Sequence, residues 1–192
     1  MQLIDSQTYI NLARSFAGEC QAQTRYKFIE YGARMQNLNC LAEIIDKVIY
    51  NEFNHARILY THIQKASNKT ITNIDVCMGT PFKQKWDLAD NLLFAAEDEA
   101  DEVKIYLDFA KTAKEEGFND IAATFKMLSD VEKSHNKLFM SLFEQMDANT
   151  MYKREKPVKW KCSACGFEAT AEKAFDTCPL CQAKQGHVLL HV

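Results

Sequence analysis

Long stretches of the chain repeat apolar residues every three or four positions, the spacing of an α-helix that buries one face. The pattern predicts helices over about residues 6–35, 39–66, 85–115 and 118–147. The first and last connections are short, whereas the connection between the second and third helices is long. Two antiparallel hairpins joined by a long crossover form a four-helix bundle. The sequence therefore predicts an all-α bundle over residues 1–150.

Two of the four apolar stripes are interrupted by the same motif, Glu-x-x-His. Glu52 and His55 interrupt the stripe of the second helix, and Glu132 and His135 interrupt that of the fourth. A spacing of three places both side chains on one helix face, one turn apart. Buried carboxylates without partners are costly and repel one another, whereas a shared metal cluster removes both costs. The two motifs therefore indicate metal ligands.

The first and third helices add carboxylates to the same interior. Glu19 follows the small residues Ala17 and Gly18 in the first stripe, which leaves room for a ligand and its metal. The third helix is rich in acids, and its apolar stripe is interrupted at two glutamates, Glu99 and Glu102. The competing register, which contains Asp98 and Asp101, is mostly polar, so we expect these two aspartates to face water.

One Glu from each of two helices and Glu-x-x-His from the other two form the ligand set of a di-iron or di-manganese site in a bundle core. Carboxylate oxygens and imidazoles suit iron and manganese, and they favour zinc less. One carboxylate exceeds that minimum set, and its presence would allow coordination to change with oxidation state. The predicted inward-facing ligands are Glu19, Glu52, His55, Glu99, Glu102, Glu132 and His135.

A second metal site is predicted near the end of the chain, where four of the seven cysteines cluster. Two Cys-x-x-Cys pairs, Cys162/Cys165 and Cys178/Cys181, are separated by twelve residues. Four thiolates form a tetrahedral site for zinc or iron, and the spacing does not choose between them. A module this small needs a metal for stability. We therefore divide residues 151–192 into a basic linker, up to Lys161, and a small metal-binding domain.

The charge of the chain argues against nucleic acid as a partner. Residues 151–192 carry seven Lys and Arg against four Asp and Glu, which leaves 16 against 22 in residues 1–150. Neither part is basic enough for a nucleic-acid surface. The N-terminus lacks the pattern of a signal peptide, and no apolar run approaches the roughly 20 residues of a membrane span. We therefore expect a cytoplasmic protein that does not bind membranes.

Several strings in the sequence resemble the rubrerythrin family. They are Phe16-Ala17-Gly18-Glu19-Cys20-Gln21-Ala22 with Arg25-Tyr26, the two Glu-x-x-His motifs, and Lys159-Trp160-Lys161-Cys162-x-x-Cys165-Gly166-Phe167 with Cys178-Pro179-x-Cys181. The resemblance covers essentially the whole chain. It implies a ferritin-like four-helix bundle followed by a small rubredoxin-like metal-binding domain, with two non-haem irons in the first and one iron in the second.

The resemblance also implies roles for the ligands. Glu52 and Glu132 would bridge the two irons, and Glu19 and His55 would be terminal ligands of one of them. The terminal ligands implied for the other iron are Glu99 and His135.

Glu102 would match a carboxylate that exchanges with a histidine when the oxidation state changes. Tyr26 and Tyr106 would donate hydrogen bonds to the ligands. Aligned from Tyr106, however, the family's pattern would place Asp98 and Asp101 at the ligand positions of the third helix, so both alignments stay open.

The activity implied by the resemblance is reduction of hydrogen peroxide to water, in defence against oxidative stress. Electrons would come from an external donor, a rubredoxin or an NAD(P)H reductase, because the sequence has no Gly-rich dinucleotide motif. The four-cysteine iron would relay them, and we expect a homodimer or a higher homo-oligomer. The alternative is a ferritin-like iron-binding ferroxidase whose four-cysteine module holds structural zinc.

Overall fold

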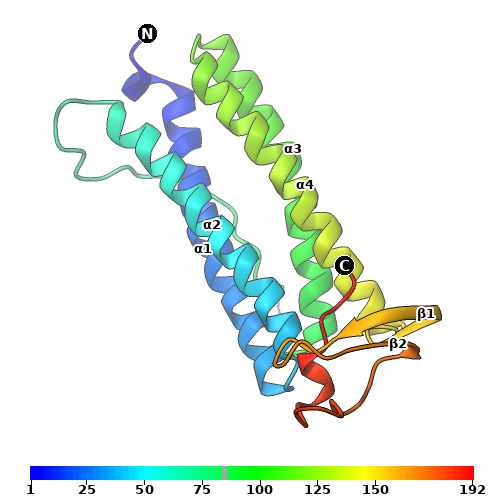
Figure 1. Ribbon diagram of the computed structural model, residues 1–192. Coiled ribbons are helices and arrows are strands. Elements are labelled where there is room, and N and C mark those ends of the chain that lie inside the picture. The colour runs from blue at the N-terminus through cyan, green and yellow to red at the C-terminus, as the bar shows by residue number, and fades with distance from the viewer. Residues whose placement is uncertain (84–85) are drawn as a thin grey trace.

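The computed structural model describes residues 1–83 and 86–192 and contains the four predicted helices (Figure 1). They are α1 (Gln7–Met35), α2 (Asn39–Lys65), α3 (Leu88–Glu115) and α4 (Asn119–Asp147), with a short 3-10 turn, η1 (Leu3–Asp5), before them. The predicted start of the third helix, at residue 85, lies outside the described residues. The all-α bundle is confirmed, with helix ends within a few residues of those expected.

Local chemistry explains where the helices begin and end. Ser6 begins α1 by accepting a hydrogen bond from the backbone N–H of Tyr9, and Asp87 caps α3 in the same way. Asn37 and Gly117, in the two short connections, have φ values of 59° and 91°. Asparagine and glycine tolerate this left-handed conformation, which reverses the chain between antiparallel helices.

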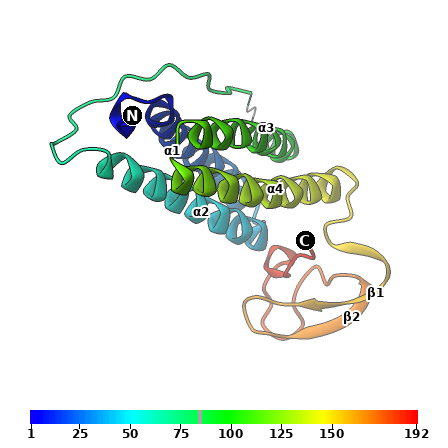
Figure 2. The same cartoon turned by 90° about the horizontal axis from the view of Figure 1, so that it is seen from above.

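The bundle consists of two hairpins, α1 with α2 and α3 with α4, that lie side by side (Figures 1 and 2). The described part of the crossover from α2 to α3, up to residue 83, runs along the outside of the bundle (Figure 2). The apolar core is divided into two clusters along the helices. One includes Tyr26, Leu92 and Phe139, and the other includes Leu12 and Phe125. The predicted metal ligands lie on the helices between these clusters.

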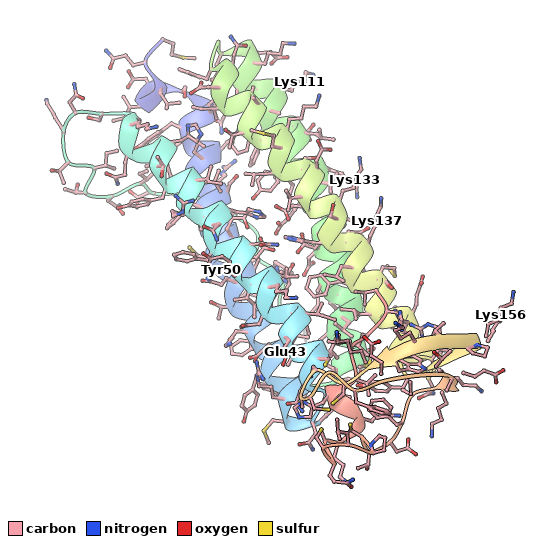
Figure 3. The ribbon with its side chains drawn as sticks, viewed as in Figure 1. Glu43, Tyr50, Lys111, Lys133, Lys137 and Lys156 are labelled. Atoms are coloured by element: carbon pink, nitrogen blue, oxygen red, sulfur yellow. The ribbon has the colours of Figure 1, made fainter. Side chains whose placement is uncertain are left out.

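Helical periodicity separates the two faces of α4. Glu132 and His135 are buried, whereas Lys133 and Lys137, labelled on the outer face in Figure 3, are exposed. None of the helices within the described residues is long and apolar enough to cross a membrane.

The C-terminal module contains a two-stranded antiparallel sheet and a 3-10 turn, η2 (Gln185–His187). Strand β1 (Lys153–Lys161) pairs with β2 (Glu168–Lys173), so the predicted linker was wrong for these nine residues. The basic side chains of the predicted linker lie on strand β1, and Trp160 of this strand is fully buried. The ladder is irregular between Lys153 and Val158, which accommodates Pro157 because proline has no N–H to donate.

The module contacts the end of the bundle at the turn between α1 and α2. The side chains of Asn39 and His187 approach within 3.1 Å. Gly186 packs so closely on this turn that an added Cβ would lie 1.7 Å from the carbonyl oxygen of Asn37. Only glycine fits this position without displacing the backbone.

Candidate metal centres

The four helices bring six of the predicted ligands together in the middle of the bundle. The glutamates among them are at most 1% exposed. Two groups of four ligand atoms each fall within 4.8 Å, and both contain Glu52 and Glu132. Glu19 and His55 complete one group, while the other is completed by Glu99 and His135.

The two shared glutamates lie between the two imidazoles. Nδ1 of His55 is 3.0 Å from Oε2 of Glu52 and 3.2 Å from Oε1 of Glu132. Nδ1 of His135 is 3.0 Å from Oε1 of Glu52 and 2.8 Å from Oε2 of Glu132. Each shared carboxylate therefore has one oxygen toward each histidine, the arrangement required of a carboxylate that bridges two metals.

The hydrogen bonding of these atoms fits a metal cluster. Both carboxylate oxygens of Glu132 are buried without an aligned hydrogen-bond partner among residues 1–83 and 86–192, and so is Nδ1 of His135. One oxygen of each of three further glutamates shares this property: Glu19, Glu52 and Glu99. Buried polar atoms are nearly always satisfied in folded proteins. Lone pairs directed into a common space are what metal ions would satisfy.

Two tyrosines hold the outer carboxylates. The hydroxyl of Tyr26 donates a 2.5 Å hydrogen bond to Oε1 of Glu99, and that of Tyr106 donates to Oε1 of Glu19. Both phenols are buried, and burial together with nearby glutamates raises their pKa well above 10. They therefore stay protonated and act as donors.

The carboxylates of the metal-free centre differ in their pKa values. Burial raises the pKa of Glu19 and of Glu99 well above the usual value. Burial alone would also raise the pKa of Glu52, but its contacts with His135 and His55 outweigh burial and hold it at about 2. Burial lowers the pKa of His135, yet contacts with Glu132 and Glu52 raise it to about 9. Imidazolium charge thus balances the carboxylates where metal charge would.

The centre is built from an internal repeat. Each predicted ligand of the first hairpin that belongs to a ligand group, and Tyr26 beside them, has a counterpart of the same type 80 positions later in the second hairpin. Each hairpin supplies one Glu, one Tyr and one Glu-x-x-His. The pairs are Glu19 and Glu99, Tyr26 and Tyr106, Glu52 and Glu132, and His55 and His135. The constant offset of 80 positions is visible in the sequence and marks the ligands, but helix periodicity alone does not reveal it.

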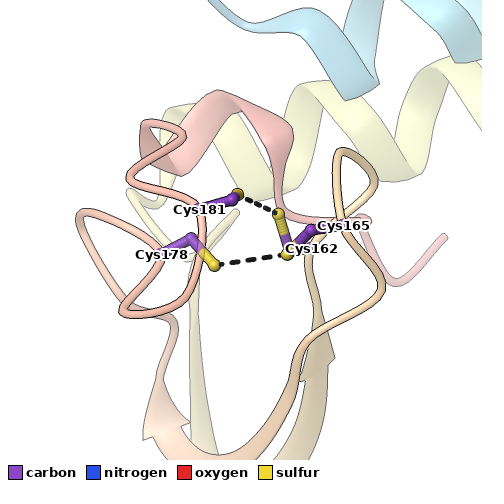
Figure 4. Close-up of side chains that lie close together, drawn as sticks. All are labelled: Cys162, Cys165, Cys178 and Cys181. Carbon is purple, nitrogen blue, oxygen red and sulfur yellow. Dashed lines mark hydrogen bonds between the residues drawn. The ribbon is translucent and has the colours of Figure 1, made fainter.

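The four cysteines also come together (Figure 4). Their sulfur atoms all lie within 4.8 Å, with 3.8 Å between Cys162 and Cys181 and 3.6 Å between Cys165 and Cys178. A tetrahedron with metal–sulfur bonds of about 2.3 Å has sulfur–sulfur edges of about 3.8 Å. The sulfurs are thus spaced for one tetrahedral ion, and all seven cysteines, each in the described part of the chain, are free of disulfides.

Comparison with known proteins identifies the family. A family model described as rubrerythrin matches residues 11–89 and 90–173, and a model of the rubredoxin-like domain of rubrerythrin matches residues 160–187. The chain belongs to the rubrerythrin family. The rubrerythrin of Clostridium perfringens strain 13 is 35% identical over 183 residues, which cover 95% of this chain and 93% of that protein. The rubrerythrin of Porphyromonas gingivalis W83 is 30% identical over 95% of this chain and 88% of its own length.

Solved structures show the same fold. Nigerythrin in its fully reduced, all-ferrous state is 20% identical, with a TM-score of 0.62 over 99% of this chain and 92% of that one. Desulfovibrio desulfuricans bacterioferritin, described with a diiron site, is 18% identical, with a TM-score of 0.62 over 75% and 82%. The ferritin-like bundle and the rubredoxin-like domain are confirmed. The residues of a di-iron carboxylate site and of a four-cysteine rubredoxin-like site are present in this member of the rubrerythrin family.

The third helix differs in part from the prediction. The expected solvent exposure of Asp98 was wrong, because this side chain is 6% exposed and pairs with the buried Arg25 of α1. Asp101 is exposed, as expected, and pairs with Lys104 at 2.8 Å. Periodicity identifies the side of α3 that faces the bundle axis, but it does not reveal a basic partner on a neighbouring helix.

Glu102 lies beside the centre rather than within it. It is half-buried and belongs to neither ligand group that the described residues form. Burial, with Glu132 and Glu52 nearby, raises its pKa to about 8. α3 is regular from Leu88 to Glu115, so straight helical counting applies along it. The exchange role inferred for Glu102 from rubrerythrins stays a prediction.

Sequence reasoning missed one polar neighbour of the centre. Nδ2 of Asn51 lies 3.2 Å from Nε2 of His135. Partners of this kind orient a ligating imidazole. Position 51 immediately precedes Glu52, but no pattern in the sequence marked Asn51 as a neighbour of α4.

Proposed function

We propose that the chain is a non-haem di-iron peroxidase that reduces hydrogen peroxide to water. The reaction consumes two electrons and two protons per peroxide, and it breaks the O–O bond to yield two water molecules. The observation that carries the proposal is the pair of buried four-ligand groups joined by Glu52 and Glu132. Two ferrous ions bound there would supply both electrons to one peroxide.

The protein's own groups would hold and orient this centre. Glu52 and Glu132 would bridge the two metal positions, and the terminal ligands would be Glu19 with His55 and Glu99 with His135. Tyr26 and Tyr106 would fix the outer carboxylates through the hydrogen bonds that they donate. The apolar clusters above and below the centre along the helices would exclude bulk water from the bundle axis.

The four-cysteine module would hold iron and relay single electrons. We take residues 1–150 as the peroxide-reducing unit and residues 151–192 as the relay unit. The module contacts the bundle at Asn39, thirteen residues before Glu52 on α2. That interval is about 20 Å of helix, which favours delivery to the di-iron centre of a second copy in a homodimer or a higher homo-oligomer. A rubredoxin or an NAD(P)H reductase would supply the electrons.

The proposal is tested by metal analysis and peroxide turnover on the same preparation. We expect two irons in the bundle and one in the cysteine module, absorption bands in the middle of the visible range from the latter, and peroxide consumption coupled to an external reductant. Iron oxidation by dioxygen without peroxide turnover, together with zinc in a colourless module, would support the ferroxidase alternative and contradict the proposal.

A further inference from the structure

A groove lies between α1 and α3 beneath the crossover segment, with a volume of about 550 Å³. Its lining extends along α1 from Arg14 to Arg25, which lie eleven positions or about 16 Å of helix apart. A water molecule occupies about 30 Å³, whereas pockets for organic ligands measure about 300–1,000 Å³. We call this space the α1–α3 groove, and its size suits an organic molecule far better than hydrogen peroxide.

Apolar side chains form much of this groove. Met78 of the crossover segment lines it, and its methyl carbon lies 3.8 Å from where a Cβ on Gly18 would be. Ile105 and Phe109, one turn apart on α3, line the same space. Ile105 is 44% exposed although an isoleucine is usually buried. An apolar ligand in the groove would remove this surface from water.

The groove adjoins the metal centre. Glu102 and Tyr106 line it, and the hydroxyl of Tyr106 donates a hydrogen bond to Glu19, one of the predicted ligands. A molecule in the groove can therefore place one end beside Glu102 and Tyr106 while its body lies against Ile105 and Phe109.

Polar atoms occur at both ends of the groove. At one end, Arg25 and Lys83 pair with Asp98, so these charges are already satisfied. At the other end, Nε of Arg14 and the hydroxyl of Ser15 are buried and have no partner among the described residues. Ser15 is buried, because only 5% of its surface is exposed. These donors could meet a polar group of a bound molecule.

We propose that the α1–α3 groove binds an organic hydroperoxide, ROOH, whose apolar body lies against Met78, Ile105 and Phe109. This inference rests on the proposed peroxidase function and extends its substrate class. The O–O bond breaks, two electrons from the reduced centre and two protons are consumed, and the products are one alcohol, ROH, and one water. The electrons come from the same external one-electron donor.

Steady-state kinetics with two substrates distinguish an effect on binding in the groove from an effect on the reaction at the metal centre. Reductant-coupled turnover of hydrogen peroxide and of cumene hydroperoxide is measured for the wild type, Ile105→Trp and Leu107→Trp. Leu107 is a matched control because it lies on the same helix, is 48% exposed and does not line the groove. Filling the groove with Ile105→Trp should lower kcat/KM for cumene hydroperoxide at least about tenfold relative to hydrogen peroxide. Leu107→Trp should leave both values unchanged.

Binding without turnover provides a second readout. The product alcohol, 2-phenyl-2-propanol, has no O–O bond and is titrated by calorimetry into the oxidised, iron-loaded full chain. It should bind to the wild type and to Leu107→Trp with the same Kd, and at least about tenfold more weakly to Ile105→Trp.

Reduction of hydrogen peroxide without reduction of cumene hydroperoxide would overturn the inference and leave the proposed function intact. Equal effects of Ile105→Trp and Leu107→Trp, in kinetics or calorimetry, would overturn it as well. Failure to reduce either substrate would overturn the proposed function itself, and the wider substrate class with it.

Discussion

Tyr26 of α1 donates a hydrogen bond to Glu99 of α3, and Tyr106 of α3 donates one to Glu19 of α1. The tyrosine of each hairpin thus holds the glutamate of the other hairpin. These two hydrogen bonds link the hairpins at the level of the metal ligands. The apolar core consists of two clusters, one above and one below this level along the helices.

Removing one of these hydroxyls should weaken metal binding without unfolding the bundle. Tyr26→Phe leaves Glu99 without its donor, and loss of a partner to a metal ligand typically lowers metal affinity about 10–100-fold. Competition with a chelator measures the change. Tyr31→Phe is the matched control, since Tyr31 is on the same helix and 58% exposed. Equal affinities for the two variants would contradict the orienting role.

The shared glutamates should be needed for iron in the bundle and not for the cysteine module. Glu52→Ala and Glu132→Ala each remove a carboxylate that contacts both histidines, so we expect loss of bundle iron. The iron of the four-cysteine site should remain. Glu43→Ala, at an exposed position of α2 labelled in Figure 3, is the control. Metal analysis that finds full bundle iron in either variant would refute the bridging assignment.

The two aspartates of α3 should differ in their effect on stability. Asp98→Asn leaves the buried Arg25 without its charged partner, which costs about 3–5 kcal/mol for a buried pair. Asp101→Asn changes an exposed residue and should alter the free energy of unfolding by about 0.5 kcal/mol or less. Urea unfolding of the metal-free proteins compares them. Similar midpoints would show that the Asp98–Arg25 pair contributes little.

The cysteine module should be required for continuous turnover only. Cys165→Ser removes one of the four sulfurs and should abolish peroxide reduction that depends on an external reductase. Protein whose bundle irons are reduced chemically beforehand should still complete a single turnover, because the bundle carries out the chemistry. Rapid mixing with one equivalent of peroxide tests this. Steady-state turnover at the wild-type rate would mean that the module is structural.

The metal-free protein should lose stability as the pH rises. His135 has a pKa of about 9 when folded, against 6.5 normally, and Glu102 has one of about 8, against 4.5. Both groups therefore bind more protons in the folded chain than in the unfolded chain. The contribution of Glu102 is lost between pH 4.5 and 8, and that of His135 between pH 6.5 and 9.

Urea midpoints at pH 6 and pH 9 measure this loss. Glu102→Gln removes one of the two groups, so its midpoint should fall less than that of the wild type. A midpoint that rises with pH in the metal-free protein would contradict the assignment.

The sequence predicted the four helices and the six grouped ligands because both depend on the period of a single helix. It failed where the outcome depends on a neighbouring element. Asp98 is buried because Arg25 lies opposite on α1, and β1 forms because β2 pairs with it and Trp160 is buried. Glu102 satisfied the periodicity of α3, yet it lies beside the ligand groups, where the α1–α3 groove replaces tight packing.

The 80-residue repeat makes the two metal positions equivalent in ligand type, so any difference in their reactivity must originate where the repeat is broken. Glu102 corresponds to Ala22, and Asn51 corresponds to Val131. The first difference adds a carboxylate to the second hairpin only, and the second places an amide beside His135 at a position whose counterpart is a valine. Making these positions alike would remove these two differences between the metal positions. The natural chain instead has a built-in polarity, with one metal position set apart from the other by residues that coordinate neither in this arrangement.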